Sequence, residues 1–214
     1  MFRDRIDAGR RLAARLFQYR NSLETTVLAL PRGGVVIGYE IARALNAPLD
    51  VLIVRKIRFP GQPELIIGAV AETGGVVLNE NIVRGGRLSE DLLRPEIDRQ
   101  KDEIARRAGV YRAGKGLPPL DSMVAILVDD GVATGDTIKA AISALKELKV
   151  ARLVLALPVG PPETLKVLRE MVDELICLEM PLSFMGVSVH YHDFTQVSDS
   201  EAADLLQKLA AKAA

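Results

Sequence analysis

The hydrophobic residues of this chain follow two alternating patterns. Continuous apolar runs, typical of strands buried on both faces, occur at residues 26–30, 51–54, 123–128, 152–157 and 175–178. Between most of these runs, apolar residues recur at helical spacing, as in Ile37, Ile41 and Leu45. Strands that alternate with helices predict an α/β fold with a mainly parallel five-stranded sheet and helices on both of its faces.

The stretch between the second and third apolar runs breaks this alternation. Residues 65–71 and 76–78 flank a glycine-rich turn and predict a β-hairpin, with Glu72 exposed at the turn. Nine of the fourteen residues from 94 to 107 are charged, which indicates a solvated helix that begins near Pro95. We interpret this stretch as an insertion into the parallel fold.

The segment that follows this charged helix has the composition of a flexible loop. Residues 109–119 contain three glycines, two prolines, two basic residues and one aromatic residue. At the start of the chain, residues 4–20 predict a helix on which Arg10, Arg11 and Arg15 form a solvated face. A local nucleic-acid contact stays open at a basic patch formed by Arg3, Arg5, Arg10, Arg11 and Arg15.

Length and composition are those of one ordinary globular domain, expected to span residues 1–214. Acidic and basic residues balance at 28 each, which removes any global electrostatic case for a nucleic-acid or membrane partner. The single Cys177 excludes an intrachain disulfide framework and fits a reducing compartment. No apolar run has the length that spans a bilayer, so we expect a cytoplasmic protein.

The most informative stretch begins at the third apolar run, where Asp129 and Asp130 follow a buried strand directly. A loop rich in small residues comes next, and then a helix. Backbone N–H groups of such a loop, together with a helix N-terminus, form a cradle for an anion. Two carboxylates beside that cradle suit sugar hydroxyls or a hard divalent cation. The stretch therefore predicts a site for a sugar phosphate with Mg²⁺.

The same arrangement of strand, glycine loop and helix occurs earlier in the chain. Pro31, Arg32, Gly33 and Gly34 separate the first apolar run from a helix, which places a cation within an anion-binding loop. Lys56 follows the second apolar run, at the edge where open α/β sheets bind ligands.

Residues 124–137 resemble the phosphoribosyl pyrophosphate (PRPP) binding motif of type I phosphoribosyltransferases. The motif consists of apolar residues, two acids, Gly, two variable positions, Thr-Gly, one variable position and Thr. The resemblance implies that Asp129 and Asp130 bind the ribose and Mg²⁺, and that Arg32, Gly33, Gly34 and Lys56 hold the pyrophosphate. It also implies a phosphate cradle formed by Gly131, Val132, Ala133, Thr134, Gly135, Asp136 and Thr137.

Two further predictions rest on position within this family. Family members close a flexible loop over PRPP just upstream of the acidic motif, which makes Tyr111, Arg112 and Lys115 candidate lid residues and Arg112 a candidate catalytic residue. A variable hood covers the acceptor in the family. The corresponding hood here is residues 1–20 and 180–214 around a core of about 22–179. Tyr191 and Phe194 are its candidate acceptor contacts.

The implied reaction is displacement of pyrophosphate from PRPP by a nitrogenous acceptor, which we expect to be a nucleobase. Ala133 stands where members that use 6-oxopurines commonly carry an aspartate, so hypoxanthine and guanine are expected to be poor acceptors. A PRPP sensor that regulates transcription and a magnesium-dependent phosphate-binding protein of another family stay open as alternatives. The sequence also leaves a homodimer open.

Overall fold

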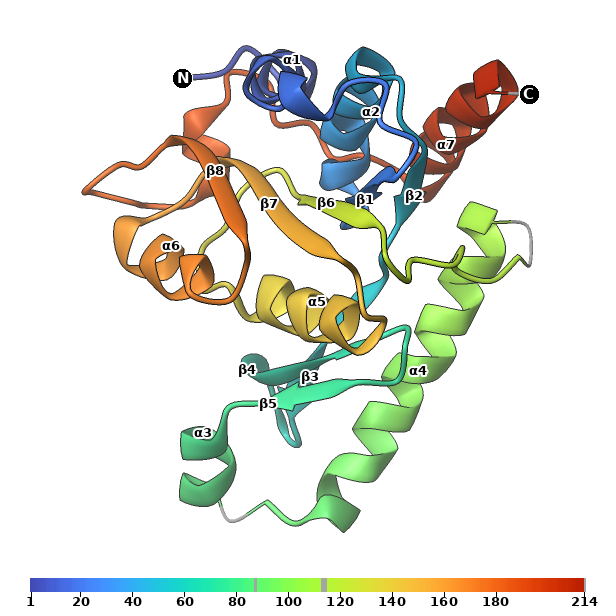
Figure 1. Ribbon diagram of the computed structural model, residues 1–214. Coiled ribbons are helices and arrows are strands. Elements are labelled where there is room, and N and C mark those ends of the chain that lie inside the picture. The colour runs from blue at the N-terminus through green and yellow to red at the C-terminus, as the bar shows by residue number, and fades with distance from the viewer. Residues whose placement is uncertain (87, 113–114, 214) are drawn as a thin grey trace.

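The computed structural model describes residues 1–86, 88–112 and 115–213, and its main body is a parallel sheet (Figure 1). The sheet has five strands, as the sequence predicted, and their order is β2-β1-β6-β7-β8. Their bounds are β2 Leu49–Val51, β1 Thr25–Ala29, β6 Val124–Val128, β7 Arg152–Val159 and β8 Glu174–Glu179. Because β6 lies beside β1, the loops that follow these two strands open at the same edge of the sheet.

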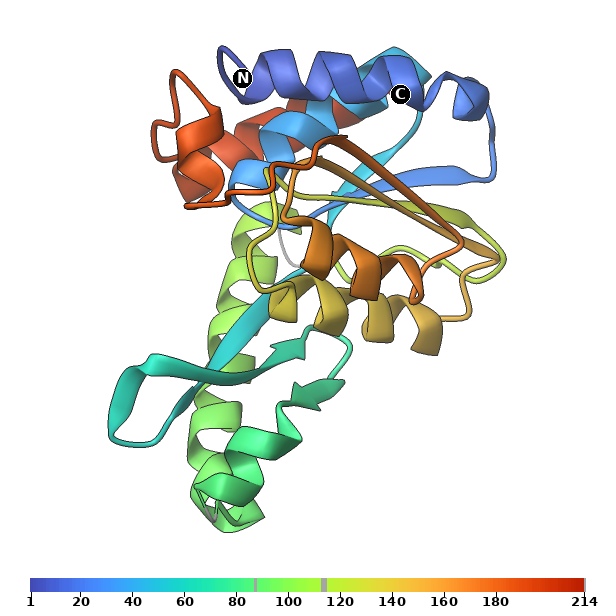
Figure 2. The same ribbon diagram turned by 90° about the vertical axis from the view of Figure 1, so that its left-hand side faces the viewer.

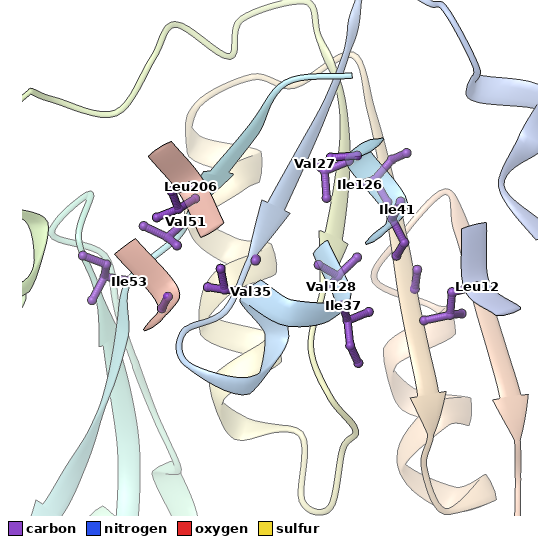
Figure 3. Packing of buried hydrophobic residues seen from close by; sticks show 14 of the residues in the cluster. Leu12, Val27, Val35, Ile37, Ile41, Val51, Ile53, Ile126, Val128 and Leu206 are labelled. Atoms are coloured by element: carbon purple, nitrogen blue, oxygen red, sulfur yellow. The ribbon is translucent and has the colours of Figure 1, made fainter. Parts of the chain in front are cut away.

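Helices cover both faces of this sheet, which confirms the predicted fold class (Figures 1 and 2). Strand β6 shows why its apolar run is continuous. Ile126 and Val128 pack into one buried cluster, and Ala125 and Leu127 pack into the other. Figure 3 shows the first cluster, in which α1, α2 and α7 contribute residues such as Leu12, Ile41 and Leu206. The helices of this face are α1 Arg5–Arg15, α2 Gly33–Leu45 and α7 Asp199–Ala213, and those of the opposite face are α5 Asp136–Glu147 and α6 Pro162–Arg169.

The inserted stretch forms a second, antiparallel sheet in the order β3-β4-β5, with bounds β3 Val54–Phe59, β4 Gln62–Ala71 and β5 Val76–Leu78. The predicted hairpin is therefore confirmed, but the predicted strand at 51–54 is wrong. The parallel ladder ends just after β2, because the Ile53 N–H donates to the Glu72 carboxylate (2.8 Å) instead of to β1. The chain then enters β3, so that Lys56 lies inside a strand of the second sheet.

The charged helix is longer than the sequence predicted. Helix α4 spans Glu90–Arg112, so it begins before Pro95 and extends into the segment from residue 109 that was predicted to be a loop. It follows the short α3 (Glu80–Gly85) and runs along the second sheet toward α7 (Figure 1). The predicted loop at 109–112 is thus helical, and Ala113 and Gly114 lie outside the described residues.

The predicted first helix, residues 4–20, is divided into α1 and the 3-10 turn η1 (Phe17–Tyr19). A second 3-10 turn, η2 (Val187–His190), lies in the C-terminal segment before α7. A capping box precedes α7, since the Glu201 N–H donates to Ser198 Oγ and the Ser198 N–H donates to the Glu201 carboxylate. None of the helices in the described part of the chain combines the length and the apolar character that crossing a membrane requires.

Candidate functional site

A cleft lies at the carboxyl edge of the parallel sheet, where β1 and β6 end and β3 begins. It consists of two adjoining cavities of about 290 and 190 Å³ that share Lys56, Asp129 and Thr137 as walls. The larger cavity also contacts Leu30, Pro31, Val54, Arg55 and Arg58. The smaller one is enclosed by residues 131–138 and Val187. The structure therefore brings three predicted site segments, 31–34, 56 and 129–137, to one place.

The wall of the smaller cavity is the loop that leads into α5. Gly135 precedes the helix with φ 82°, a conformation that glycine adopts without strain, and Gly131 has φ 154°. A Cβ atom on Gly131 would lie 2.6 Å from a Val187 methyl carbon, so the loop also needs a small residue there for close packing. Because the first N–H groups of a helix have no acceptor within the helix, the loop and the start of α5 present donors to an anion.

The loop at 31–34 packs directly against the acidic pair. A Cβ atom on Gly34 would lie 3.0 Å from the Val128 carbonyl oxygen and 3.2 Å from Asp129 Oδ1. On Gly33, a Cβ atom would lie only 1.9 Å from Asp130 Oδ2. Both glycines are therefore required by close approach, which explains their position in the sequence pattern. Arg32 immediately precedes α2, and the Pro31–Arg32 peptide bond is cis.

Asp129 is the carboxylate that faces the cleft. It lines both cavities, and its Oδ1 accepts the Asp130 backbone N–H at 2.8 Å. Burial raises the pKa of Asp129 well above the ordinary range, and the neighbouring Asp130 charge raises it further. The hydrogen bond from the Asp130 backbone N–H opposes this increase in the pKa, as do the charges of Arg5 and Lys56, but the net direction is upward.

Asp130 is directed toward α1 and the C-terminal segment. Its Oδ2 accepts a hydrogen bond from Arg5 Nε at 2.8 Å, and its backbone carbonyl accepts one from the Tyr191 hydroxyl at 2.7 Å. Burial raises the pKa of Asp130, and the Arg5 guanidinium works against the increase. The sequence predicted a solvated face for Arg10, Arg11 and Arg15 of this helix, whereas the Arg5 side chain is only 10% exposed.

The basic wall of the larger cavity comes from β3, where Lys56 and Arg58 alternate with residues of the other strand face. Arg55 also reaches this cavity, but its Nε donates to Gln100 of α4 at 3.0 Å. Burial lowers the pKa of Arg55, as do the nearby cations, among them Arg107 and Arg58. Arg58 was not among the predicted site residues. It is two residues from Lys56, and this spacing places both side chains on the same face of a strand, which is the signal that could have identified it.

The candidate lid residues occupy different environments. Tyr111 is buried, and its hydroxyl donates to Asp199 of α7 at 2.6 Å. Arg112 makes four hydrogen bonds, to Asp50, Glu72 and the Val51 carbonyl oxygen. The placement of these two residues in a loop is therefore a wrong prediction, because partly buried carboxylates on other elements hold the last turn of α4. Lys115 is exposed.

Glu72 is also placed differently from the prediction. It is not exposed at the hairpin turn, since its side chain is 9% exposed and receives two hydrogen bonds from Arg112.

The candidate acceptor contacts, Tyr191 and Phe194, lie next to the Asp130–Arg5 pair. The rings of Tyr191 and Phe194 are 5.0 Å apart, and Arg5 lies 3.8 Å above the Phe194 ring. Phe2 is fully buried and packs 5.3 Å from Tyr191. The first residues of the chain and residues 190–193 are joined by backbone hydrogen bonds. A role for Tyr191 and Phe194 at an acceptor stays a prediction.

The cleft offers the Asp129 carboxylate to Mg²⁺, and substrate phosphates and water would supply the remaining ligands. Within residues 1–86, 88–112 and 115–213, no group of three or more His, Cys, Asp or Glu side chains forms a complete protein cage for a metal. Mg²⁺ commonly takes one or two carboxylates, water and the phosphate oxygens of a substrate. Asp129, at the wall of both cavities, is suited to supply that carboxylate.

Comparison with known proteins relates this chain to one family. The model of the phosphoribosyl transferase domain family matches residues 3–193. A Mycobacterium tuberculosis protein, named as a candidate phosphoribosyl transferase, is 43% identical over 208 residues, which cover 97% of this chain and 47% of that protein. The chain thus spans about half the length of this relative. The crystal structure of TT1426 from Thermus thermophilus is 38% identical, with a TM-score of 0.82 and coverage of 97% and 98% of the two chains.

Proposed function

Because the chain belongs to the phosphoribosyl transferase family, we propose that it transfers the phosphoribosyl group of PRPP to a nitrogenous acceptor and releases pyrophosphate. The observation that carries the proposal is the shared wall of the two cavities. Asp129 and Lys56 stand between an anion cradle on one side and a basic wall on the other. A sugar with a phosphate at one end and a pyrophosphate at the other matches this order of groups.

In this proposal the 5′-phosphate binds the loop 131–137, and Asp129 accepts hydrogen bonds from the ribose hydroxyls. Arg32 and Lys56 bind the pyrophosphate. The reaction breaks the bond between ribose C1 and the pyrophosphate oxygen and forms a bond between C1 and an acceptor nitrogen. Mg²⁺, when bound through Asp129 and phosphate oxygens, would take up negative charge on the leaving group. The chain itself positions the two reactants and stabilises charge, without covalent catalysis.

This proposal gives Arg112 a structural role. Its guanidinium is occupied by buried carboxylates on β2 and after β4, and so it fixes the end of α4. Arg58 on β3 is the better candidate for a mobile contact to the pyrophosphate, because it lines the larger cavity close to the Pro60–Gly61 turn of the hairpin.

The direct test is release of pyrophosphate from PRPP and Mg²⁺ with a panel of purine, pyrimidine and amine acceptors. We expect turnover with at least one acceptor, and low rates with hypoxanthine and guanine, because the Ala133 methyl group cannot exchange a proton. Asp129→Asn is the inactive control. Binding of PRPP without turnover would favour a regulatory protein, and absence of PRPP binding would contradict both functions.

A second test separates the two ends of PRPP. We expect Lys56→Ala to weaken pyrophosphate and PRPP by about tenfold or more, because each charge-assisted contact contributes about 1.5–3 kcal/mol. Ribose 5-phosphate, which lacks the pyrophosphate, should bind almost as it does to the unmodified protein. Calorimetry with the three ligands measures this difference, and Arg84→Ala, which alters an exposed ion pair on α3, is the control. Equal losses for all three ligands would contradict the assignment of Lys56.

A further inference from the structure

Arg5 is fixed by contacts on three sides. Its Nε donates to Asp130 Oδ2 and its Nη1 donates to the Thr195 carbonyl oxygen, both at 2.8 Å. Its guanidinium stacks over the Phe194 ring at 3.8 Å, a geometry that favours a cation. A planar guanidinium held in this way has a defined orientation, which an ammonium group could not reproduce.

Asp130 is confined just as closely. Gly33 packs against its carboxylate so tightly that a Cβ atom there would also lie 2.7 Å from Arg5 Nε. The Tyr191 hydroxyl holds the backbone carbonyl of Asp130 on another side. The two adjacent acids are therefore directed differently, with Asp129 lining both cavities and Asp130 paired with Arg5.

This division matters because the proposed ligand is a polyanion. Two adjacent, buried carboxylates would repel phosphate groups in the cavities that Asp129 lines, and burial weakens the screening of that repulsion by solvent. A cation paired with one carboxylate removes about half of the negative charge of the pair. Arg5 pairs with Asp130 and is not among the residues that line either of the two cavities, so it can act on the ligand through its charge without contacting it.

We propose that Arg5 is a positioning and charge-compensating residue, which holds Asp130 in place and allows a polyanion to bind beside the acidic pair. The inference rests on the proposed function, because it takes pyrophosphate or PRPP as the ligand. It assigns to α1, which lies outside the recognised motif, a part in ligand binding.

The test is a charge cycle on Arg5 and Asp130, with inorganic pyrophosphate in the absence of Mg²⁺ as the calorimetric probe. Arg5→Gln removes the positive charge beside Asp130 and should weaken pyrophosphate binding by about tenfold or more, because solvent screens charges at partly buried sites only in part. Asp130→Asn should have the opposite effect and strengthen pyrophosphate severalfold, because Arg5 is then uncompensated. The double variant, with both charges removed, should return to within about threefold of the unmodified protein.

A merely structural role for Arg5 would not produce opposite signs or recovery in the double variant. Weaker binding in both single variants, or unchanged binding in both, would overturn the inference. If Arg5→Gln does not fold, Arg5→Lys replaces it. Because lysine keeps the positive charge, Arg5→Lys alone should cause a smaller loss, and combined with Asp130→Asn it should bind pyrophosphate more tightly than the unmodified protein does. If the unmodified protein binds neither pyrophosphate nor PRPP with Mg²⁺, the proposed function itself fails, which is distinguishable from a failed charge cycle.

Discussion

Replacement of Arg112 by alanine is expected to lower the free energy of unfolding by about 3–5 kcal/mol, the usual cost of removing one partner from a buried ion pair. The Arg112 side chain is 6% exposed and contacts two carboxylates, Glu72 at 2.6 Å and Asp50 at 2.8 Å. Without the guanidinium, both carboxylates stay buried without a cationic partner. Burial already raises the pKa of Asp50 in the presence of Arg112, and the substitution would strengthen this effect.

Urea unfolding measures the loss, and Arg106→Ala is the matched control. Arg106 lies on the same helix and pairs with Glu103 at 2.7 Å, but its side chain is 56% exposed. Its removal should leave the free energy of unfolding almost unchanged, as is typical of exposed pairs. Combining Arg112→Ala with Asp50→Asn should recover part of the loss, because one buried charge is removed. Equal effects of Arg112→Ala and Arg106→Ala would show that the buried network is not stabilising.

Gly33→Ala is expected to reduce PRPP affinity and pyrophosphate release by about 100-fold, because displacement of a positioned group by about 1 Å is enough for such a loss. The new methyl group would meet Asp130 Oδ2 at 1.9 Å and Arg5 Nε at 2.7 Å. Both contacts are the ends of side chains, so the ion pair would move while the backbone stays in place. The stability loss should therefore stay within the range of about 1–3 kcal/mol that overpacking usually costs.

Gly109→Ala provides the control for this substitution. A Cβ atom on Gly109 would meet no described atom within 4 Å, and alanine is the better helix former, so α4 should be unchanged or slightly more stable. Calorimetry with PRPP and thermal unfolding of both variants compare the effects. Normal PRPP affinity in Gly33→Ala would mean that the arrangement of Asp130 and Arg5 has no influence on the cleft.

Features encoded locally could be predicted from the sequence. Alternate residues of β6 point to opposite faces of the sheet, and all of them are apolar. The uninterrupted apolar run therefore predicted that both faces of this strand are buried. The loops at 31–34 and 131–137 were recognisable because close packing and backbone conformation require glycine at fixed positions. These short-range requirements leave a readable pattern.

Features that depend on long-range pairs could not be predicted in the same way. Arg5 and Asp130 are 125 residues apart, and nothing in the spacing of α1 distinguishes Arg5 from its exposed neighbours. Arg112 and Glu72 are 40 residues apart, and their pairing extends α4 through residues with a loop composition. The end of β2 likewise depends on where the Glu72 carboxylate lies. In each case a tertiary contact overrode the local signal.

The position of β6 between β1 and β7 has a consequence for how the chain is made. During synthesis β1 can pair with β2 early, since the two strands are close in sequence, but its other edge waits for residues 124–128. Until then that edge exposes unpaired backbone groups beside the apolar side chains of Val27 and Leu28, which is the kind of surface that aggregates. Chains that stall or are cut before residue 124 would therefore be substrates for chaperones and proteases. The cleft would form only after residues 129 and 131–137, which line it, have been synthesised.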